Sequence, residues 1–131
     1  MTVERMNPPT LSTPTGYSQV VVASGSKLVF VAGQVSLDAE GNLVAPGDVV
    51  GQARQAFANV RTALEAAGAS IADVAKITWF VVGFDPARLP ELAAARRETF
   101  GDHAPASTLI GVQSLAQPEF LVEAEAIAVL E

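Results

Sequence analysis

The stretch that decides the fold runs from Asp48 to Val82, DVVGQARQAFANVRTALEAAGASIADVAKITWFVV. In its first half, apolar residues recur at the spacing of one helix face. These residues are Ala53, Ala56, Phe57, Val60, Ala63, Leu64 and Ala67. Asp48 is a favourable N-cap, and Gly68 suits the position just past a helix end. In the second half, Val74 to Val82 is apolar on both alternating faces, which predicts a buried strand.

The polar residues of the predicted helix are expected on its other side. They are Gln52, Arg54, Gln55, Asn59, Arg61 and Glu65. Upstream of the helix, the runs Gln19–Ala23 and Lys27–Gly33 flank Gly25-Ser26, which predicts a hairpin of two strands. Residues 1–16 are rich in Pro, Thr and Ser and predict an irregular lead-in.

Downstream of the buried strand, the chain predicts one more helix and two more strands. Their ranges are Leu89–Phe100 for the helix, then Ala106–Val112 and Leu121–Leu130 for the strands. The order is therefore ββαβαββ in one domain, residues 1–131. Two helices on one face of a mixed sheet make an α+β arrangement. Because the strands are apolar on both faces, the face without helices is expected to meet another subunit.

The composition supports that expectation and excludes several classes of function. Half of the residues are hydrophobic and 17% are charged, against about 25% charged in typical soluble domains. Cysteine is absent, which excludes disulfides and thiolate chemistry. The net charge of −6 argues against nucleic acid as a partner. No signal peptide or membrane-length apolar run is recognisable, so the expected location is the cytoplasm.

Glu123 is the strongest candidate for chemistry. Glutamate is depleted in strands, yet the last strand carries Glu123 and Glu125 on a face with Leu121, Ile127 and Val129. A carboxylate among apolar neighbours is costly unless it is paired or protonated, and such a group suits acid–base catalysis. The alternative is an ordinary buried ion pair with Lys76 or an arginine. The strand pattern by itself favours this alternative.

The remaining candidates are weaker. His103, the single histidine, follows a helix end and is expected to be an exposed loop residue without partners for a metal. Ser107 and Thr108 lack a histidine at useful spacing, so a serine nucleophile is not expected. No glycine-rich phosphate loop is present. Tyr17 either packs or directs its phenol into a pocket.

Short motifs in a fixed order resemble the RidA/YjgF family, also called the endoribonuclease L-PSP family. They cover residues 16–131 as Gly16–Gln19, Ala32–Val35, Gln52–Val60, Leu64–Gly68, Ala75–Thr78, Pro105–Thr108 and Val122–Ala128. The resemblance implies a chorismate-mutase-like fold and a homotrimer with a central barrel and pockets at subunit interfaces. It also implies cofactor-free and metal-free hydrolysis of reactive imines and enamines, such as 2-iminobutanoate, to 2-keto acids and ammonia.

The resemblance assigns roles to individual residues. Tyr17 matches the pocket tyrosine, Gly33 the glycine whose backbone lines the pocket, and Glu123 the glutamate that positions or activates water. The backbone of Thr108 and Leu109 is expected to hold polar substrate atoms. The substrate-binding arginine of the family is replaced by Ser107.

Two further positions depart from the family pattern. The usual serine before the pocket glycine is Ala32, and a helix asparagine of some members aligns with Ala93. The lost arginine matters most, because a hydroxyl cannot replace a bidentate, charge-assisted contact to a carboxylate. Another arginine could supply that charge from a neighbouring subunit, and the candidates are Arg88, Arg96 and Arg97.

These observations predict a deaminase-type hydrolase of imines or enamines whose substrate need not be a 2-imino acid. A second hypothesis from the same missing arginine is a non-catalytic trimer that binds a small metabolite. Ribonuclease activity is a third and weaker hypothesis, which the acidic net charge opposes.

Overall fold

The computed structural model describes residues 2–131 and contains two helices, six strands and two short 3₁₀ helices. The order is β1 (Thr2–Met6), β2 (Val20–Ser24), β3 (Lys27–Gln34), α1 (Val49–Ala66), β4 (Val74–Val82), α2 (Leu89–Phe100), β5 (Ala106–Val112) and β6 (Val122–Leu130). The 3₁₀ helices are Ile71–Asp73 and Pro86–Arg88. Within residues 2–131, no helix is long and apolar enough to cross a bilayer.

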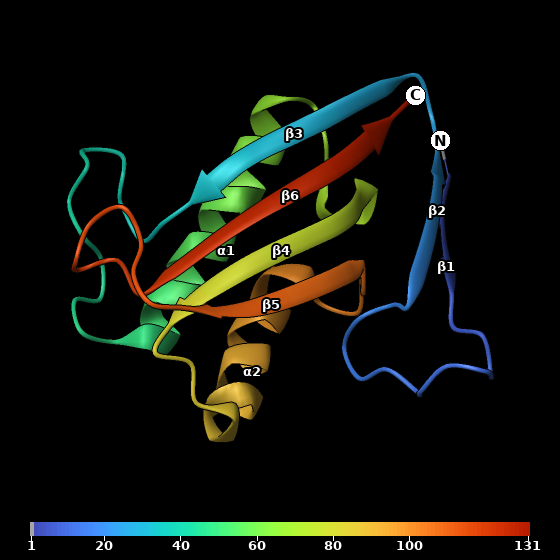
Figure 1. The fold of residues 1–131 in the computed structure, drawn as a ribbon. Coiled ribbons are helices and arrows are strands. Elements are labelled where there is room, and N and C mark those ends of the chain that lie inside the picture. Colours follow the sequence, from blue (N-terminus) through green and yellow to red (C-terminus); the bar gives the residue numbers. More distant parts are fainter. Residues whose placement is uncertain (1) are drawn as a thin grey trace.

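The main sheet has the strand order β3-β6-β4-β5. β6 is antiparallel to both β3 and β4, whereas β4 and β5 are parallel. A parallel pair needs a crossover, and α2 supplies it between β4 and β5. Figure 1 shows both helices on the same side of this sheet. The predicted α+β class, with a mixed sheet and two helices on one face, is therefore confirmed. We call the face without helices the open face.

The prediction for the first strands was wrong in two respects. The expected irregular lead-in contains β1, which pairs with β2 from Thr2 opposite Ser24 to Met6 opposite Val20. β2 therefore forms a separate two-stranded ribbon with β1 (Figure 1) and no hairpin with β3. The turn between β2 and β3 lies against the end of β6 instead. The backbone N–H of Ser26 in this turn donates to the Leu130 carbonyl at 2.8 Å.

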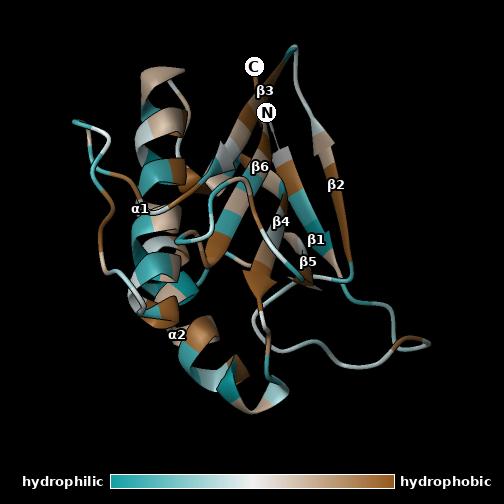
Figure 2. Ribbon diagram, turned by 60° about the vertical axis from the view of Figure 1, so that its left-hand side comes forward, coloured by the Kyte–Doolittle hydropathy of each residue, from teal (hydrophilic) through white to brown (hydrophobic). Residues whose placement is uncertain are grey.

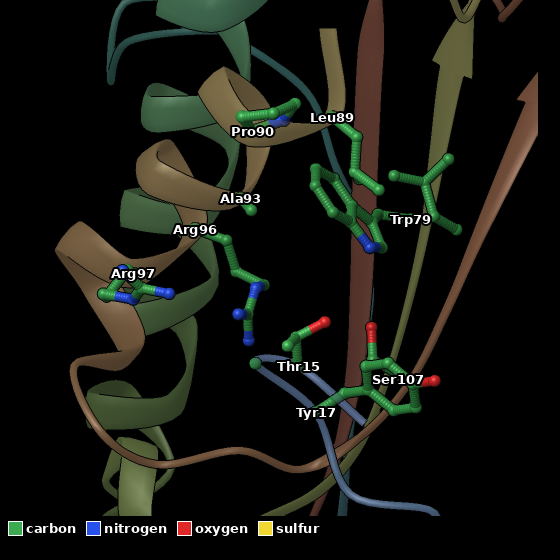
Figure 3. Close-up of a pocket in the computed structure, with 11 residues that line it drawn as sticks. Thr15, Tyr17, Trp79, Leu89, Pro90, Ala93, Arg96, Arg97 and Ser107 are labelled. Carbon is green, nitrogen blue, oxygen red and sulfur yellow. The ribbon is translucent and has the colours of Figure 1, made fainter. Parts of the chain in front are cut away.

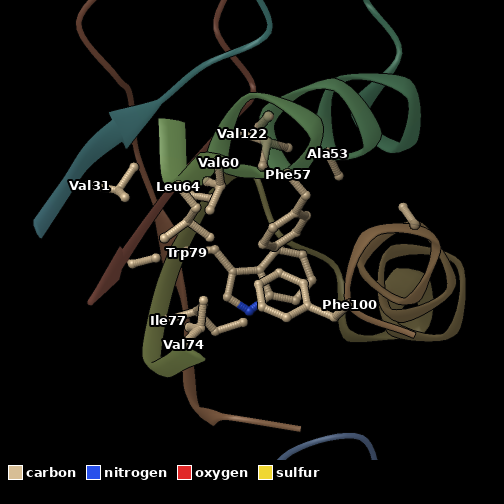
Figure 4. Packing of buried hydrophobic residues seen from close by; sticks show 14 of the residues in the cluster. Val31, Ala53, Phe57, Val60, Leu64, Val74, Ile77, Trp79, Phe100 and Val122 are labelled. Carbon is tan, nitrogen blue, oxygen red and sulfur yellow. The ribbon is translucent and has the colours of Figure 1, made fainter. Parts of the chain in front are cut away.

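The core lies between the helices and the sheet. Figure 4 shows the Phe57 ring from α1 beside Trp79 of β4 and Phe100 of α2. The ring centroids of Phe57 and Trp79 are 5.1 Å apart, and those of Phe57 and Phe100 are 5.7 Å apart. Both pairs are edge-on, an arrangement that aromatic rings favour. The predicted apolar face of α1 is confirmed for five residues that are fully buried, Ala53, Ala56, Phe57, Val60 and Leu64. It was wrong for Ala67, which is exposed.

Gln52 corrects the prediction for the other side of α1. Its side chain is fully buried. The Nε2 group donates to the carbonyls of Glu119 at 3.1 Å and Ala45 at 3.3 Å, while Oε1 accepts from the Leu121 N–H at 2.9 Å. Two loops fold over the start of α1 here, and helical periodicity carries no signal for loops that return from elsewhere in the chain.

The open face carries large apolar side chains. Leu28 and Phe30 on β3 are 63% and 70% exposed, and Ile110 on β5 is 39% exposed. Figure 2 shows the two helices to one side of the sheet, away from this face. Leu28 and Phe30 lie two residues apart on one edge strand, and neighbouring exposed apolar side chains of this size mark interaction surfaces in soluble proteins.

Candidate functional site

A cavity of about 400 Å³ lies between α2 and β5. Figure 3 shows its walls, which come from three parts of the chain. Residues of α2 form one wall, Trp79 with Ser107 and Leu109 forms the sheet side, and the segment Thr15–Tyr17 closes an end. Three residues assigned from the family resemblance, Tyr17, Ser107 and Leu109, therefore line one cavity.

Tyr17 reaches this cavity because the segment around it docks on the start of β5. The N–H of Ser18 donates to the Pro105 carbonyl at 3.1 Å, and the Ser18 hydroxyl donates to the Ala104 carbonyl. Ser18 and Ala106 form a parallel β-bridge. This docking places Tyr17 next to the strand that carries Ser107.

Thr108 lies outside the cavity. Successive side chains of a strand point to opposite faces, and Thr108 is on the open face, where its hydroxyl accepts from Lys76 Nζ at 2.6 Å. Its side chain therefore takes no part in the α2–β5 cavity.

Glu123 is also on the open face. Its neighbours on β6, Val122 and Ala124, are fully buried in the core, so Glu123 points the opposite way. Its carboxylate packs on Gly33 of β3, where a Cβ would lie only 2.3 Å from Glu123 Oε2. Within one chain, Gly33 and Glu123 therefore form a second group, separated by the sheet from the cavity that contains Tyr17 and Ser107.

The ion-pair alternative for Glu123 is not observed. In the described part of the chain, neither Glu123 nor Glu125 forms an ion pair, and Lys76 donates to Thr108 instead. Glu123 lies opposite Phe80 of β4, beside an uncharged side chain. Its carboxylate is half-buried and open to a group that approaches from outside the chain.

The position of Arg96 and Arg97 in the α2–β5 cavity could not be established from the sequence. Both line the α2–β5 cavity of their own chain. They follow Ala93, another cavity residue, at the three- and four-residue spacing that puts side chains on one helix face. Burial lowers the pKa of the Arg96 guanidinium from its usual range, and the positive charge of Arg97 lowers it further.

Arg88, the third arginine considered as a replacement, lies elsewhere. It pairs with Glu91 on the surface, with 3.4 Å between Arg88 Nε and Glu91 Oε1, and is not among the residues of the α2–β5 cavity.

His103 is half-buried, so its predicted exposure was wrong. Its Nε2 lies 2.8 Å from the Val74 carbonyl oxygen. A carbonyl only accepts, so Nε2 carries the proton and donates. This bond ties the loop after α2 to the start of β4. Among residues 2–131, no three His, Cys, Asp or Glu side chains gather as metal ligands would.

Comparison with known proteins agrees with the fold and the motif order. The family model described as endoribonuclease L-PSP matches residues 9–130. A RutC family protein of Pyrococcus horikoshii is 37% identical over 116 residues, which cover 88% of this chain and 87% of that protein. A 2-iminobutanoate/2-iminopropanoate deaminase of Dermatophagoides farinae is 32% identical over 115 residues, which cover 88% of this chain and 86% of that protein.

A solved structure shares the fold over the full length. YyfB from Yersinia pestis, a protein of unknown function of the conserved Rid family, superposes with a TM-score of 0.93 at 38% identity and covers 99% of this chain and 100% of its own. The family model spans nearly the whole chain, and relatives more than 30% identical cover most of it. The resemblance found in the sequence is thus confirmed, and the chain belongs to the RidA/YjgF family, the family of the endoribonuclease L-PSP model.

Proposed function

We propose that this chain hydrolyses reactive imines or enamines, releasing ammonia and a carbonyl product, with Glu123 acting on the attacking water. The observation that carries the proposal is the contact between Glu123 and Gly33, in which the carboxylate lies against backbone that has no Cβ. Similar proteins named 2-iminobutanoate/2-iminopropanoate deaminase, at 32% and 34% identity, give further support.

The contact with Gly33 suits a carboxylate that must position water. Glu123 has no ion-pair partner among the described residues, so its oxygens remain available as acceptors. The absence of a Cβ at Gly33 lets the carboxylate lie directly against the Gly33 backbone. A substrate atom beside this contact would meet both backbone polar groups and the water held by Glu123.

The reaction needs water and one acid–base group. Glu123 accepts a proton as the water oxygen attacks the carbon of the protonated imine, which gives a neutral tetrahedral carbinolamine. The same group then returns this proton to nitrogen. As the C–N bond breaks and ammonia leaves, the carboxylate takes up the proton of the hydroxyl group, which becomes the carbonyl, and later releases that proton to solvent. An enamine enters this sequence after it takes up a proton on carbon to become the protonated imine. General acid–base catalysis of this kind contributes roughly 10²–10⁴-fold in rate.

A complete site requires a second copy of the chain. Glu123 and Gly33 lie on the open face, while Tyr17 and Ser107 lie on the side of the helices. One substrate can meet both groups only if the open face of one copy approaches the α2–β5 cavity of another. The proposed assembly is a homotrimer, which the exposed Leu28 and Phe30 support. Position 107 offers a hydroxyl, so a carboxylate is not held there as in arginine-bearing relatives.

The test is hydrolysis of imines formed in situ by oxidation of amino acids, followed through ammonia release. Glu123→Gln keeps the shape of the side chain and removes its basicity, and we expect a loss of about a hundredfold in rate. The matched control is Glu125→Gln, because Glu125 lies on the same strand and face but is exposed opposite Thr78. Equal activity of Glu123→Gln and the wild type would rule out the proposed role.

Ser107 also favours a second candidate, a non-catalytic trimer that binds a small metabolite. Ligands that raise the thermal midpoint of wild-type protein but are never turned over would favour this function. Ribonuclease activity remains opposed by the net charge of −6. We expect highly purified protein to leave RNA intact, as judged by gel analysis.

A further inference from the structure

We propose that Arg96, together with Arg97, binds the carboxylate of a small organic acid in the α2–β5 cavity. The helix would thereby supply the cation that the strand lacks at position 107. The identity of the acid, a 2-oxo or 2-imino acid, rests on the proposed function. The existence of a carboxylate site does not.

The first observation is a buried cation without an acceptor. Arg96 is only 6% exposed, yet it forms no hydrogen bond or ion pair with any described residue. Every fully buried side-chain nitrogen or oxygen in the described chain does have a hydrogen-bond partner. The Arg96 nitrogens must therefore reach the surface of the cavity that this side chain lines. Figure 3 shows the side chain extending from α2 toward Thr15 and Tyr17.

The second observation is the charge around it. Arg97 lines the same cavity, so two guanidinium groups share one space. Its remaining lining residues contain no aspartate or glutamate. Burial and like-charge repulsion both disfavour the charged form of Arg96, and both lower its pKa. A buried charge is tolerated when an opposite charge pairs with it. An anion entering this cavity would provide that charge.

The third observation is the fit of the surrounding backbone. Gly16 has a φ of 78°, and a Cβ there would lie 2.6 Å from Arg96 Nη2. The guanidinium therefore occupies the space beside the Gly16 backbone that the Cβ of any other residue would fill. Ser107 faces the same cavity from β5 with a short side chain. An arginine at position 107 would add a third cation to this cavity and repel the other two. The serine on β5 avoids this repulsion while the helix supplies the positive charge.

The rest of the lining defines the kind of acid. Trp79, Leu89, Pro90 and Leu109 make the wall largely apolar, and Tyr17 and Ser107 add two hydroxyl groups. A volume of about 400 Å³ is near the lower end of the roughly 300–1,000 Å³ found for ligand pockets. The site fits a carboxylate with a short apolar body and one further polar group, as in 2-oxobutanoate.

The first test compares two probes on the wild-type protein by titration calorimetry. 2-Oxobutanoate carries the carboxylate, and 2-oxobutanamide replaces it with a neutral amide of the same shape. We expect the acid to bind at least about tenfold more tightly, because charge-assisted hydrogen bonds are roughly twice as strong as neutral ones. Equal affinity for the two probes would overturn the proposal. Inorganic phosphate binding as tightly as the acid would overturn its assignment to an organic carboxylate.

The second test moves the cation. Arg96→Met keeps much of the side-chain volume and removes the charge, and we expect binding of 2-oxobutanoate to fall at least about tenfold. Arg88→Met is the matched control, since Arg88 belongs to the same helical region but lies outside the cavity. The double variant Arg96→Met with Ser107→Arg returns a cation from the strand and should restore affinity. Arg96→Met that binds the acid like the wild type would contradict the proposal.

The outcomes separate this proposal from the proposed function. Arg96-dependent binding without ammonia release from any imine would leave the carboxylate site standing and remove the catalytic role. Imine hydrolysis with the same KM in Arg96→Met and the wild type would leave the catalytic role standing and remove the site. If Arg96→Met does not fold, Arg96→Lys is the replacement variant, because it keeps a positive charge on a side chain of similar length. Arg96→Lys should retain preference for the acid over the amide.

Discussion

Two glycines of this chain each lie against one functional side chain. Gly33 faces the Glu123 carboxylate, and Gly16 faces the Arg96 guanidinium. In both cases the space that a Cβ would occupy is taken by the functional group itself. At Gly33 this is the carboxylate proposed for catalysis, and at Gly16 it is the guanidinium proposed for carboxylate binding. These residues also illustrate what one-letter patterns miss, because nothing near Gly16 in the sequence indicates that Arg96 is its neighbour.

Gly33→Ala should reduce imine hydrolysis with little effect on stability. The new Cβ would meet Glu123 Oε2 at 2.3 Å, and the end of this flexible side chain can move away while the backbone stays. We expect activity to fall about tenfold or more, in the range of an acid–base contribution. The double variant Gly33→Ala with Glu123→Gln should lose little more activity than Glu123→Gln alone, because the effects of two residues in contact are not additive.

The matched control for Gly33→Ala is Ala39→Ser, a change at an exposed position in the loop after β3. It should leave ammonia release within a factor of about two of wild type. Additive losses in the Gly33 and Glu123 double variant would show that Gly33 acts on something other than the carboxylate.

Gly16→Ala should weaken binding of 2-oxobutanoate as well as stability. An alanine at a φ of 78° is strained, at about 1 kcal/mol, and its Cβ would displace Arg96. Gly41→Ala separates the two effects, because Gly41 has a φ of 82° and no atom within 4 Å of its added Cβ. Both variants should lose similar stability in urea, and only Gly16→Ala should lose affinity. Equal affinity in the two variants would contradict a role for this contact.

At the scale of elements, the two helices have different tasks. α1 packs on the sheet and anchors loops through one residue near its start and one near its middle. Gln52 binds the loop before β6, and Asn59 Nδ2 donates to the carbonyls of Val35 and Leu37 at 2.9 Å each. α2 also contributes to the core through Leu92 and Phe100, and Arg96, which lies between them at four-residue spacing, reaches the cavity from the same helix. One short helix thus provides both packing and the cavity's cations.

Gln52→Ala should destabilise the fold by about 2–4 kcal/mol. The change removes three hydrogen bonds and leaves the half-buried Leu121 N–H without its acceptor. The measurement is urea unfolding followed by far-UV circular dichroism. The control is Gln113→Ala, an exposed position expected to change stability by less than about 0.5 kcal/mol. A loss for Gln52→Ala no larger than for Gln113→Ala would contradict the structural role of these bonds.

At the scale of the whole molecule, the open face and the α2–β5 cavity have separable roles. The cavity is formed within one chain, whereas Glu123 and Gly33 are directed to the other side of the sheet. A monomer should therefore keep the carboxylate site and lose the arrangement proposed for catalysis. Binding and hydrolysis should then differ in their dependence on assembly.

Phe30→Glu should convert the protein to a folded monomer. Phe30 is 70% exposed in the chain, so a glutamate there costs little in the monomer but would bury a charge at a subunit interface. Light scattering after size-exclusion chromatography measures the assembly. We expect hydrolysis to be lost and 2-oxobutanoate binding to remain. Leu11→Glu, at a residue 49% exposed in the segment before β2, should leave assembly intact. A monomeric wild type would contradict the proposed trimer.

The sequence determined the layer arrangement and the family. The helix face around Phe57, the buried strand Val74–Val82 and the second helix Leu89–Phe100 follow from periodicity and caps, which are local properties of the chain. The ordered motifs brought Tyr17, Gly33 and Glu123 to attention. The pairing of β2 with β1 was missed, because strand pairing depends on which edge is available and not on the run of residues itself.

Tertiary structure alone decided where the charges lie. It placed Tyr17 and Ser107 in one cavity and put Glu123 across the sheet from them. It also directed Arg96 into the cavity in which position 107 provides a serine and no cation. The physical reason is that a side chain's surroundings depend on elements brought together by packing. A helix and a strand that are neighbours only in space share no pattern in the sequence.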